Sequence, residues 1–65
     1  MKHYYDLRGN YKAYSNDGKH LYSQDGQYIG YFLNGYLYSQ NGKMIGHVKD
    51  KWVYDNQGQV LYHSS

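Results

Sequence analysis

Apolar and aromatic residues in this chain form short runs of four or five residues, separated by polar turn residues about every eight positions. This spacing is typical of short strands in an all-β meander. Within the runs, alternation places Leu21 and Leu37 on one face of a strand and Tyr22 and Tyr38 on the other. No segment has the 3.6-residue period of a helix. The pattern therefore predicts an all-β fold in which both strand faces are largely apolar.

The strands belong to a repeat of about 16 residues. Residues 38–53 align with residues 22–37, and Tyr, Ser, Gln, Gly, Ile and Gly recur identically. A fixed period of this kind indicates that one small unit is used several times. A Tyr followed four residues later by Gly marks four copies: Tyr5/Gly9, Tyr22/Gly26, Tyr38/Gly42 and Tyr54/Gly58. We expect a single domain, 1–65, of four β-hairpins at about 5–21, 22–37, 38–53 and 54–65, the last completed by 1–4.

Each copy contains the signature of a tight turn. Asp or Ser follows the marker Tyr, with Gly three residues later, as in a type I turn. Arg8 and Gln57 precede Gly in two copies, and neither residue suits the left-handed conformation that a two-residue I′ turn requires. We therefore expect a three-residue loop in which only the Gly is left-handed, in a G1 bulge. A second turn joins successive hairpins, at 16–18, 33–35 and 49–51.

The two ends of the chain complement each other. The fourth copy ends after its return strand, 59–63, whereas residues 2–5 match 19–22 and 51–54. The N-terminal strand is therefore expected to pair with the C-terminal one and to close the array into a ring with pseudo-four-fold symmetry. Closure would remove two exposed strand edges. The alternative is an open single-layer meander with both edges unpaired.

The turn positions also predict which residues face each other. They pair Leu21 with Ile29 on a mainly aliphatic face and Tyr22 with Tyr28 on the opposite face. One step further, Tyr36 is expected opposite Gly46, and Trp52 opposite Tyr62. In this register Gly30, opposite His20, and Gly46 lie under aromatic rings, a known way to cover a strand glycine.

Several of these motifs are similar to those of a known family. The segment 16–21, Asn-Asp-Gly-Lys-His-Leu, and the doubled Tyr-Ser-Gln-Asp/Asn-Gly-x-x-Ile-Gly resemble the four-fold β-flower domain. The resemblance spans about residues 4–62 and implies a small bacterial module of short hairpins around a pseudo-four-fold axis. It implies no established activity and no catalytic residues.

Composition limits the ways in which so short a chain can be stabilised. There are 65 residues and no Cys, so disulfides and thiolate metal sites are excluded. Eleven Tyr residues supply large buried area with a polar tip. No apolar run approaches the roughly 18 residues of a membrane helix, and we expect a soluble cytoplasmic chain. The net charge of +2 does not by itself indicate a polyanion partner.

The residue types used in catalysis or metal binding show no recognisable arrangement. His3 and His20 share one repeat position and His47 and His63 another, but a stable metal site usually needs three or four ligands. Each Asp lies in a turn, where it can bond the local backbone. No Ser has the context of a nucleophile. We therefore expect no enzyme activity, no cofactor and no metal.

The aromatic strand face is the candidate functional surface. Aromatic residues of this kind favour protein partners when exposed, because they offer rigid area and hydrogen-bonding tips. If the same face is buried, it forms the core of the ring or of a homodimer, and the sequence leaves both alternatives open. Single-stranded nucleic acid is the rival ligand, held by stacking and a rim of lysines. The candidate residues are Tyr22, Tyr28, Tyr36, Tyr38, Trp52 and Tyr54.

Overall fold

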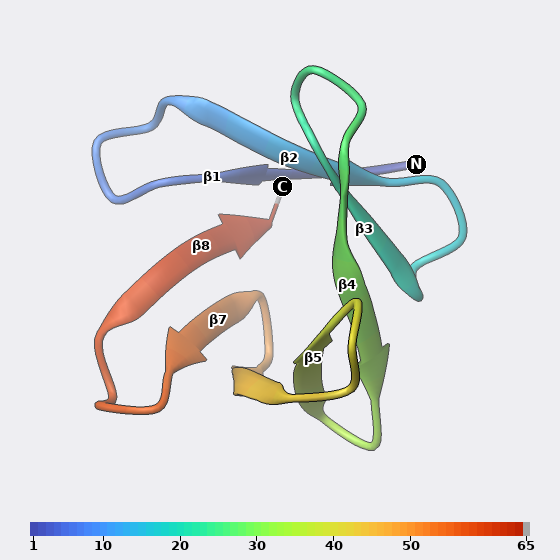
Figure 1. Ribbon diagram of the computed structural model, residues 1–65. Helices are drawn as coiled ribbons and strands as arrows, with labels where there is room; N and C mark the ends of the chain where they lie inside the picture. Colours follow the sequence, from blue (N-terminus) through green and yellow to red (C-terminus); the bar gives the residue numbers. More distant parts are fainter. Residues whose placement is uncertain (65) are drawn as a thin grey trace.

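The computed structural model describes residues 1–64, which form eight antiparallel strands in a closed barrel (Figure 1). The strands follow one another around the barrel in chain order. They are β1 Lys2–Tyr5, β2 Tyr11–Ser15, β3 His20–Ser23, β4 Tyr28–Leu33, β5 Tyr36–Ser39, β6 Met44–Lys49, β7 Trp52–Asp55 and β8 Val60–Ser64. The predicted all-β fold of four hairpins is confirmed. Residue 65, the last of the expected fourth repeat, lies outside the described residues.

The barrel closes where the first strand meets the last. Tyr4 pairs with Ser64 and Tyr5 with His63, and both chain ends lie on the same side in Figure 1. The Ser64 amide also donates a hydrogen bond to the Lys51 carbonyl at 2.8 Å, which ties the end of β8 to the β6–β7 turn. The predicted closure is therefore confirmed, and the open meander is wrong.

The hairpin loops have the predicted conformation. In the second hairpin, the Gly26 amide donates to the Ser23 carbonyl at 2.9 Å, and the Ser23 amide donates to the Gln27 carbonyl at 2.8 Å. Gly26 has a φ of 92°, in the left-handed region that glycine adopts without steric cost. The equivalent glycines of the other three hairpins also have positive φ. This is the type I turn with a G1 bulge.

A second bulge, which the sequence analysis did not predict, shifts the register within each hairpin. Tyr22 pairs with Tyr28 as expected, but Leu21 pairs with Gly30, so Ile29 has no opposite residue. The predicted pairing of Tyr36 with Gly46 and of Trp52 with Tyr62 is consequently wrong. Tyr36 faces His47, and Trp52 faces His63. A bulge bends its strand and increases the local twist, which strands this short need in order to close a barrel.

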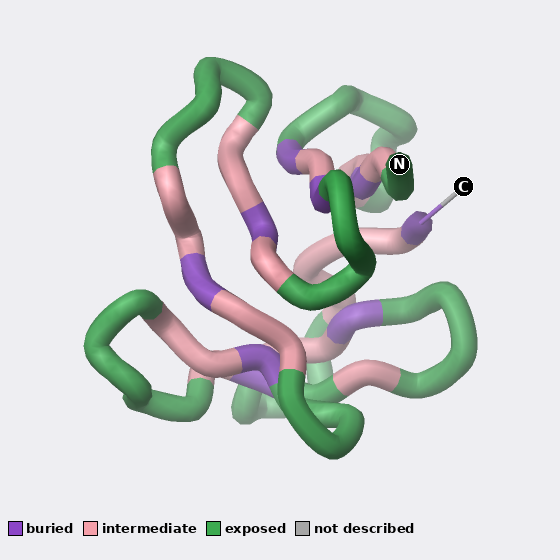
Figure 2. The backbone as a smooth tube through the Cα atoms, turned by 90° about the vertical axis from the view of Figure 1, so that its right-hand side faces the viewer, coloured by how far each residue is buried: buried purple, intermediate pink, exposed green. Residues whose placement is uncertain are grey.

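The mainly aliphatic strand face forms the interior, which settles the choice that the sequence left open between the two strand faces. Leu21, Leu37 and Val53, which share one repeat position, are 0–1% exposed. The fourth member of this ring is Tyr4, which stacks on Phe32 with ring centroids 5.8 Å apart. Tyr4 has space for its ring because both of its cross-strand partners, Ala13 and Ser64, are small. Figure 2 shows the buried positions in the middle of the strands and the exposed positions in the loops.

Gly30 and Gly46 lie in the interior, where neighbouring hairpins approach each other closely. A Cβ added at Gly46 would lie 1.9 Å from the Tyr54 carbonyl oxygen, and one at Gly30 equally close to that of Tyr38. Only glycine fits at these two positions, because the backbone of the neighbouring strand leaves no space for a side chain. The prediction that these glycines lie under aromatic rings is therefore wrong. The equivalent position in the first hairpin is Ala13. There the junction with the next hairpin, β2 with β3, has only two paired positions, against four between β4 and β5 and four between β6 and β7.

Replacing Gly46 by Ala should destabilise the protein by about 3 kcal/mol or more, because the added methyl group meets a backbone oxygen that cannot rotate away. Ala13→Gly at the equivalent position should cost only about 1 kcal/mol. Urea denaturation followed by Trp52 fluorescence measures both values. Equal stability of the Gly46→Ala variant and the parent chain would contradict the close approach of β6 and β7.

Deleting residues 1–5 should abolish cooperative unfolding, because the deletion removes both the closing strand and the buried Tyr4 side chain. Circular dichroism during urea titration measures the transition. Deletion of Met1 alone, which is 74% exposed, is the control and should leave the transition intact. A sharp transition in the longer deletion would show that the barrel does not depend on its seam.

Candidate functional site

The six candidate residues all lie on the outside of the barrel. They alternate with the interior residues Leu21, Leu37 and Val53, so their side chains point away from the core. Tyr36 is 43% exposed and Trp52 is 40% exposed, and the other four are half-buried. The alternative that this face forms the interior of the ring is therefore wrong.

Pairs of rings cover the outside of every junction between hairpins. Three of the pairs are stacked, and the Tyr5–His63 pair at the seam is tilted. Each pair joins two residues that face each other across neighbouring strands. Contacts of this kind add about 0.5–1.5 kcal/mol each beyond the area that they bury. The pairs thus reinforce the junctions from outside while holding their rings in fixed positions. Their centroid distances are 5.5 Å for Tyr14–Tyr22, 5.4 Å for Tyr31–Tyr38, 5.2 Å for His47–Tyr54 and 5.7 Å for Tyr5–His63.

The structure does not bring all six candidates onto one side. Tyr22 lies on β3 and Tyr54 on β7, four strands away in a barrel of eight. Tyr22 and Tyr28 form their own pair, with ring centroids 5.5 Å apart. Tyr36, Tyr38, Trp52 and Tyr54 lie on β5 and β7, on either side of β6.

Strand β6 contributes residues that the sequence analysis did not select. His47 faces Tyr36 on one side and Tyr54 on the other, so it joins β5 to β7. Met44 pairs with Tyr38 and is 42% exposed. Their repeat phase could have identified them, since each occupies a position held by Tyr in other copies. We define the β5–β7 surface as Tyr36, Tyr38, Met44, His47, Trp52 and Tyr54.

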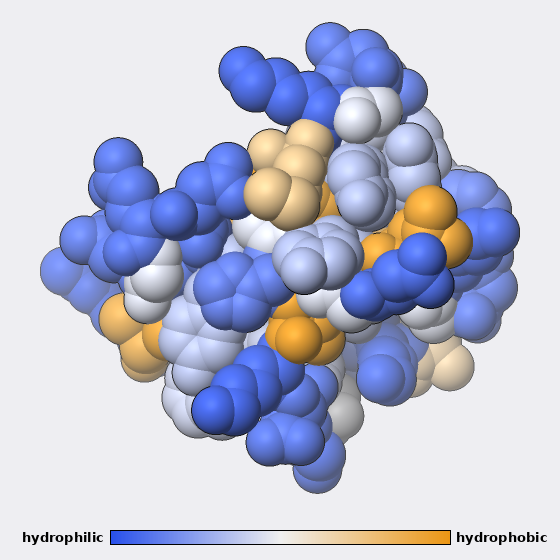
Figure 3. Space-filling view, turned by 90° about the horizontal axis from the view of Figure 1, so that it is seen from below, coloured by the Kyte–Doolittle hydropathy of each residue, from blue (hydrophilic) through white to orange (hydrophobic). Residues whose placement is uncertain are grey.

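The face seen in Figure 3 has a mixed surface. Pale and orange groups lie over its middle and at places along its edge, with hydrophilic side chains between and around them.

The four histidines lie on the outside as well, among the rings. The His63 ring lies between two aromatic rings, with centroids 5.7 Å from Tyr5 and 5.4 Å from Trp52. The His3 ring makes an edge contact with Tyr11. Among residues 1–64, no group of three or more His or acidic side chains is arranged to hold a metal ion.

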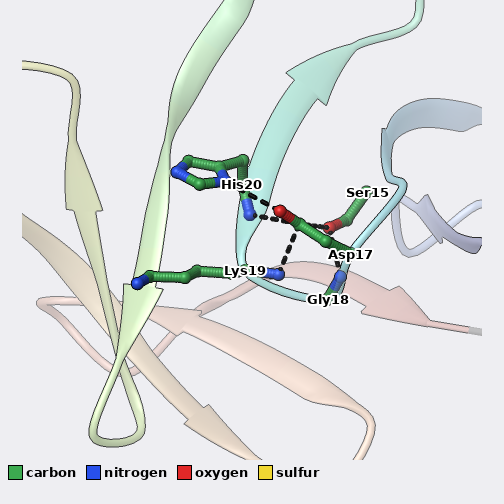
Figure 4. A network of polar contacts seen from close by, with 5 residues as sticks. All are labelled: Ser15, Asp17, Gly18, Lys19 and His20. Atoms are coloured by element: carbon green, nitrogen blue, oxygen red, sulfur yellow. Dashed lines mark hydrogen bonds and ion pairs between the residues drawn. The ribbon is translucent and has the colours of Figure 1, made fainter.

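His20 belongs instead to a polar network at the turn between β2 and β3 (Figure 4). The Asp17 carboxylate accepts hydrogen bonds from the backbone amides of Lys19 and His20, each at 2.9 Å, and lies 2.9 Å from His20 Nδ1. The Gly18 amide donates to Ser15 Oγ. The His20 amide, the His20 ring and the Lys19 amide together hold the pKa of the Asp17 carboxyl well below its usual value. This turn is one residue longer than the equivalent ones, and the network orders it.

Each of the four hairpins has a left-handed Gly in its loop, and pairing of the first strand with the last closes the array. The fold is therefore a small β-barrel with pseudo-four-fold symmetry. The chain matches the model of the family described as 4-fold beta flower protein over residues 2–65, and it belongs to this family. Comparisons with curated proteins and with solved structures give no match. Within residues 1–64 there is no helix long and apolar enough to cross a membrane.

The pKa of the Asp17 carboxyl should lie below 3.8 in an NMR titration of its carboxyl carbon. Because folding lowers this pKa, the ionised form stabilises the fold above pH 3.8, and this contribution is lost as the pH falls through the folded-state pKa. The stability difference between the parent chain and Asp17→Asn should therefore shrink between pH 5 and pH 2. A pKa at or above 3.8 would contradict the bonding network.

Proposed function

We propose that the protein is a non-catalytic interaction module that binds a partner protein through the β5–β7 surface. One observation carries the proposal: Tyr36, Met44 and Trp52 remain 40–43% exposed although the barrel already has a complete interior made of other residues. Large side chains left exposed together are typical of protein-binding surfaces. The proposal includes a location in the cytoplasm, as the sequence analysis expects.

The stacked rings support the proposal because they restrict motion before binding. His47 and Tyr54 are stacked at 5.2 Å and Tyr31 and Tyr38 at 5.4 Å, so Tyr38 and Tyr54 are held by neighbours on adjacent strands. Binding therefore costs little side-chain entropy, which favours affinity. Trp52, with its ring centroid 5.4 Å from that of His63, offers the largest side chain at the edge of the surface.

A pull-down from the native host tests the proposal. Trp52→Ala should weaken capture of the partner about 30-fold, as expected for a large aromatic contact residue worth about 2 kcal/mol. Tyr11→Ala is the matched control, because Tyr11 is 36% exposed but lies on β2, outside the β5–β7 surface. Light scattering over a dilution series shows whether the partner is a second copy of the chain. Equal capture by both variants, together with a monomer at all concentrations, would contradict the proposal.

Single-stranded nucleic acid is the second candidate ligand. One observation favours it: Lys49 and Trp52 face each other across β6 and β7, so a basic and an aromatic residue share one place on the outside of the barrel. Binding of this kind depends on phosphate neutralisation and falls steeply with salt. A labelled oligonucleotide should then bind more weakly at 200 mM than at 50 mM salt, and Lys49→Gln should reduce the salt slope. Absence of binding at 50 mM salt would remove this candidate.

A further inference from the structure

A hollow of about 220 Å³ lies at the end of the barrel where the connections between hairpins meet. The turns of three junctions reach it, through Gly18, Gly35 and Asp50, and the closing strand reaches it through Lys2. The hairpin loops lie at the other end of the barrel, since the strands are antiparallel. The hollow therefore belongs to neither the loops nor the β5–β7 surface.

The hollow exists because small residues replace large ones at two repeat positions. Ser64 lies in its wall, at the position that Phe32 and Val48 occupy in the second and third hairpins. Gly35 lies at its mouth, at the position that Lys2, Lys19 and Lys51 occupy in the other hairpins. The side chains that line this space lack packing partners on one side. A ligand that fits would supply the missing contacts.

The inner lining of the hollow is apolar and partly aromatic. Phe32, Val48 and Val53 line it together with Tyr4, whose ring stacks on that of Phe32. Burial raises the pKa of the Tyr4 hydroxyl, so this phenol remains uncharged at neutral pH. A dry apolar cavity of about 150 Å³ is known to hold a benzene molecule. The space is therefore large enough for one aromatic ring and a short polar group.

The mouth of the hollow carries a net positive charge. Lys2 and Lys51 line it, and Asp50 is the one acidic side chain in the lining. Lys2 and Lys51 come from strand β1 and from the β6–β7 turn, and the barrel holds both at the same end. Two flexible ammonium groups near an apolar floor favour a ligand whose anionic group stays at the mouth while its apolar part enters.

We propose that this axial hollow binds a small carboxylate whose apolar part, of about the size of one aromatic ring, packs between Phe32, Val48 and Val53 while its carboxylate lies between Lys2 and Lys51. The ligand is a free small molecule, because a hollow of about 220 Å³ has space for one ring and a short polar group and for little more. This site is independent of the β5–β7 surface.

NMR titration of the full chain with 3-phenylpropanoate tests the proposal. Saturable shifts should appear at the amides of Gly18, Gly35, Val48 and Ser64, with a Kd on the order of 1 mM for a ligand of this size. The uncharged amide of the same acid and 3-phenylpropylamine should bind at least about fivefold more weakly, because neither gains from the lysines. Equal binding of all three compounds, shifts confined to other residues, or no saturation up to about 20 mM would overturn the proposal.

Variants separate the two parts of the site. Lys51→Gln and Lys2→Gln should each weaken binding of the carboxylate about threefold and leave binding of the amide unchanged. Lys43→Gln removes the same charge at the opposite end of the barrel, next to the β5–β6 loop, and should change neither. Ser64→Val introduces the residue that the third hairpin has at this position, and it should weaken both ligands by filling the space. An unchanged affinity in the Ser64→Val variant would place the ligand elsewhere.

Two further titrations test whether the ligand is a free small molecule and whether the hollow is separate from the β5–β7 surface. A short peptide ending in Phe presents the same ring and carboxylate, and tighter binding of the peptide than of 3-phenylpropanoate would overturn the assignment to a free small molecule. Trp52→Ala should bind 3-phenylpropanoate with unchanged affinity, because Trp52 does not line the hollow. Loss of binding in this variant would show that the ligand occupies the β5–β7 surface instead.

Discussion

The seam between β1 and β8 is the constraint on which the rest of this structure depends. It consists of only two paired positions, Tyr4 with Ser64 and Tyr5 with His63. Without it the chain is a curved meander with two unpaired edges and no enclosed space. With it, each strand has two neighbours, and residues from all four hairpins surround one axis. The interior therefore forms as a consequence of closure, which links residues more than 55 positions apart in the sequence.

A barrel of eight strands with four to six residues each has a very small interior. The large fully buried side chains are Leu21, Leu37 and Val53, with Tyr4 completing their ring. Phe32 and Tyr62 pack against this core, and the other aromatic side chains lie on the opposite strand face. The Tyr-rich strand face is therefore placed outside by geometry, where its rings stack across the junctions instead of filling a core. The same rings consequently stabilise the barrel and form its surface.

Much of this fold could be predicted from the sequence, because the signals involved are local or repeated. The turn glycines, the period of 16 residues and the complementary ends each follow from short motifs. The bulges at Ile29 and Ile45 could not be predicted, because they depend on the curvature that closure imposes and not on the residues themselves. Without the bulge at Ile45, the predicted register placed Gly46 under Tyr36, and the close approach of Gly46 to the Tyr54 carbonyl was missed. For the candidate site, the sequence identified Tyr36 and Tyr54 but not His47 between them, because that link requires the correct register.

The presence of Tyr4 in the interior ring limits how symmetric the chain can become. Four side chains converge at that level of the axis, and one of them is a large phenol that extends across to Phe32. Four identical hairpins would bring either four phenol rings or none to this level of the axis. The centre of the barrel would be overcrowded in the first case and underfilled in the second. The four units are therefore not interchangeable, and the first hairpin is specialised as the one that fills the centre. The repeated framework packs because the units differ at this one level of the axis.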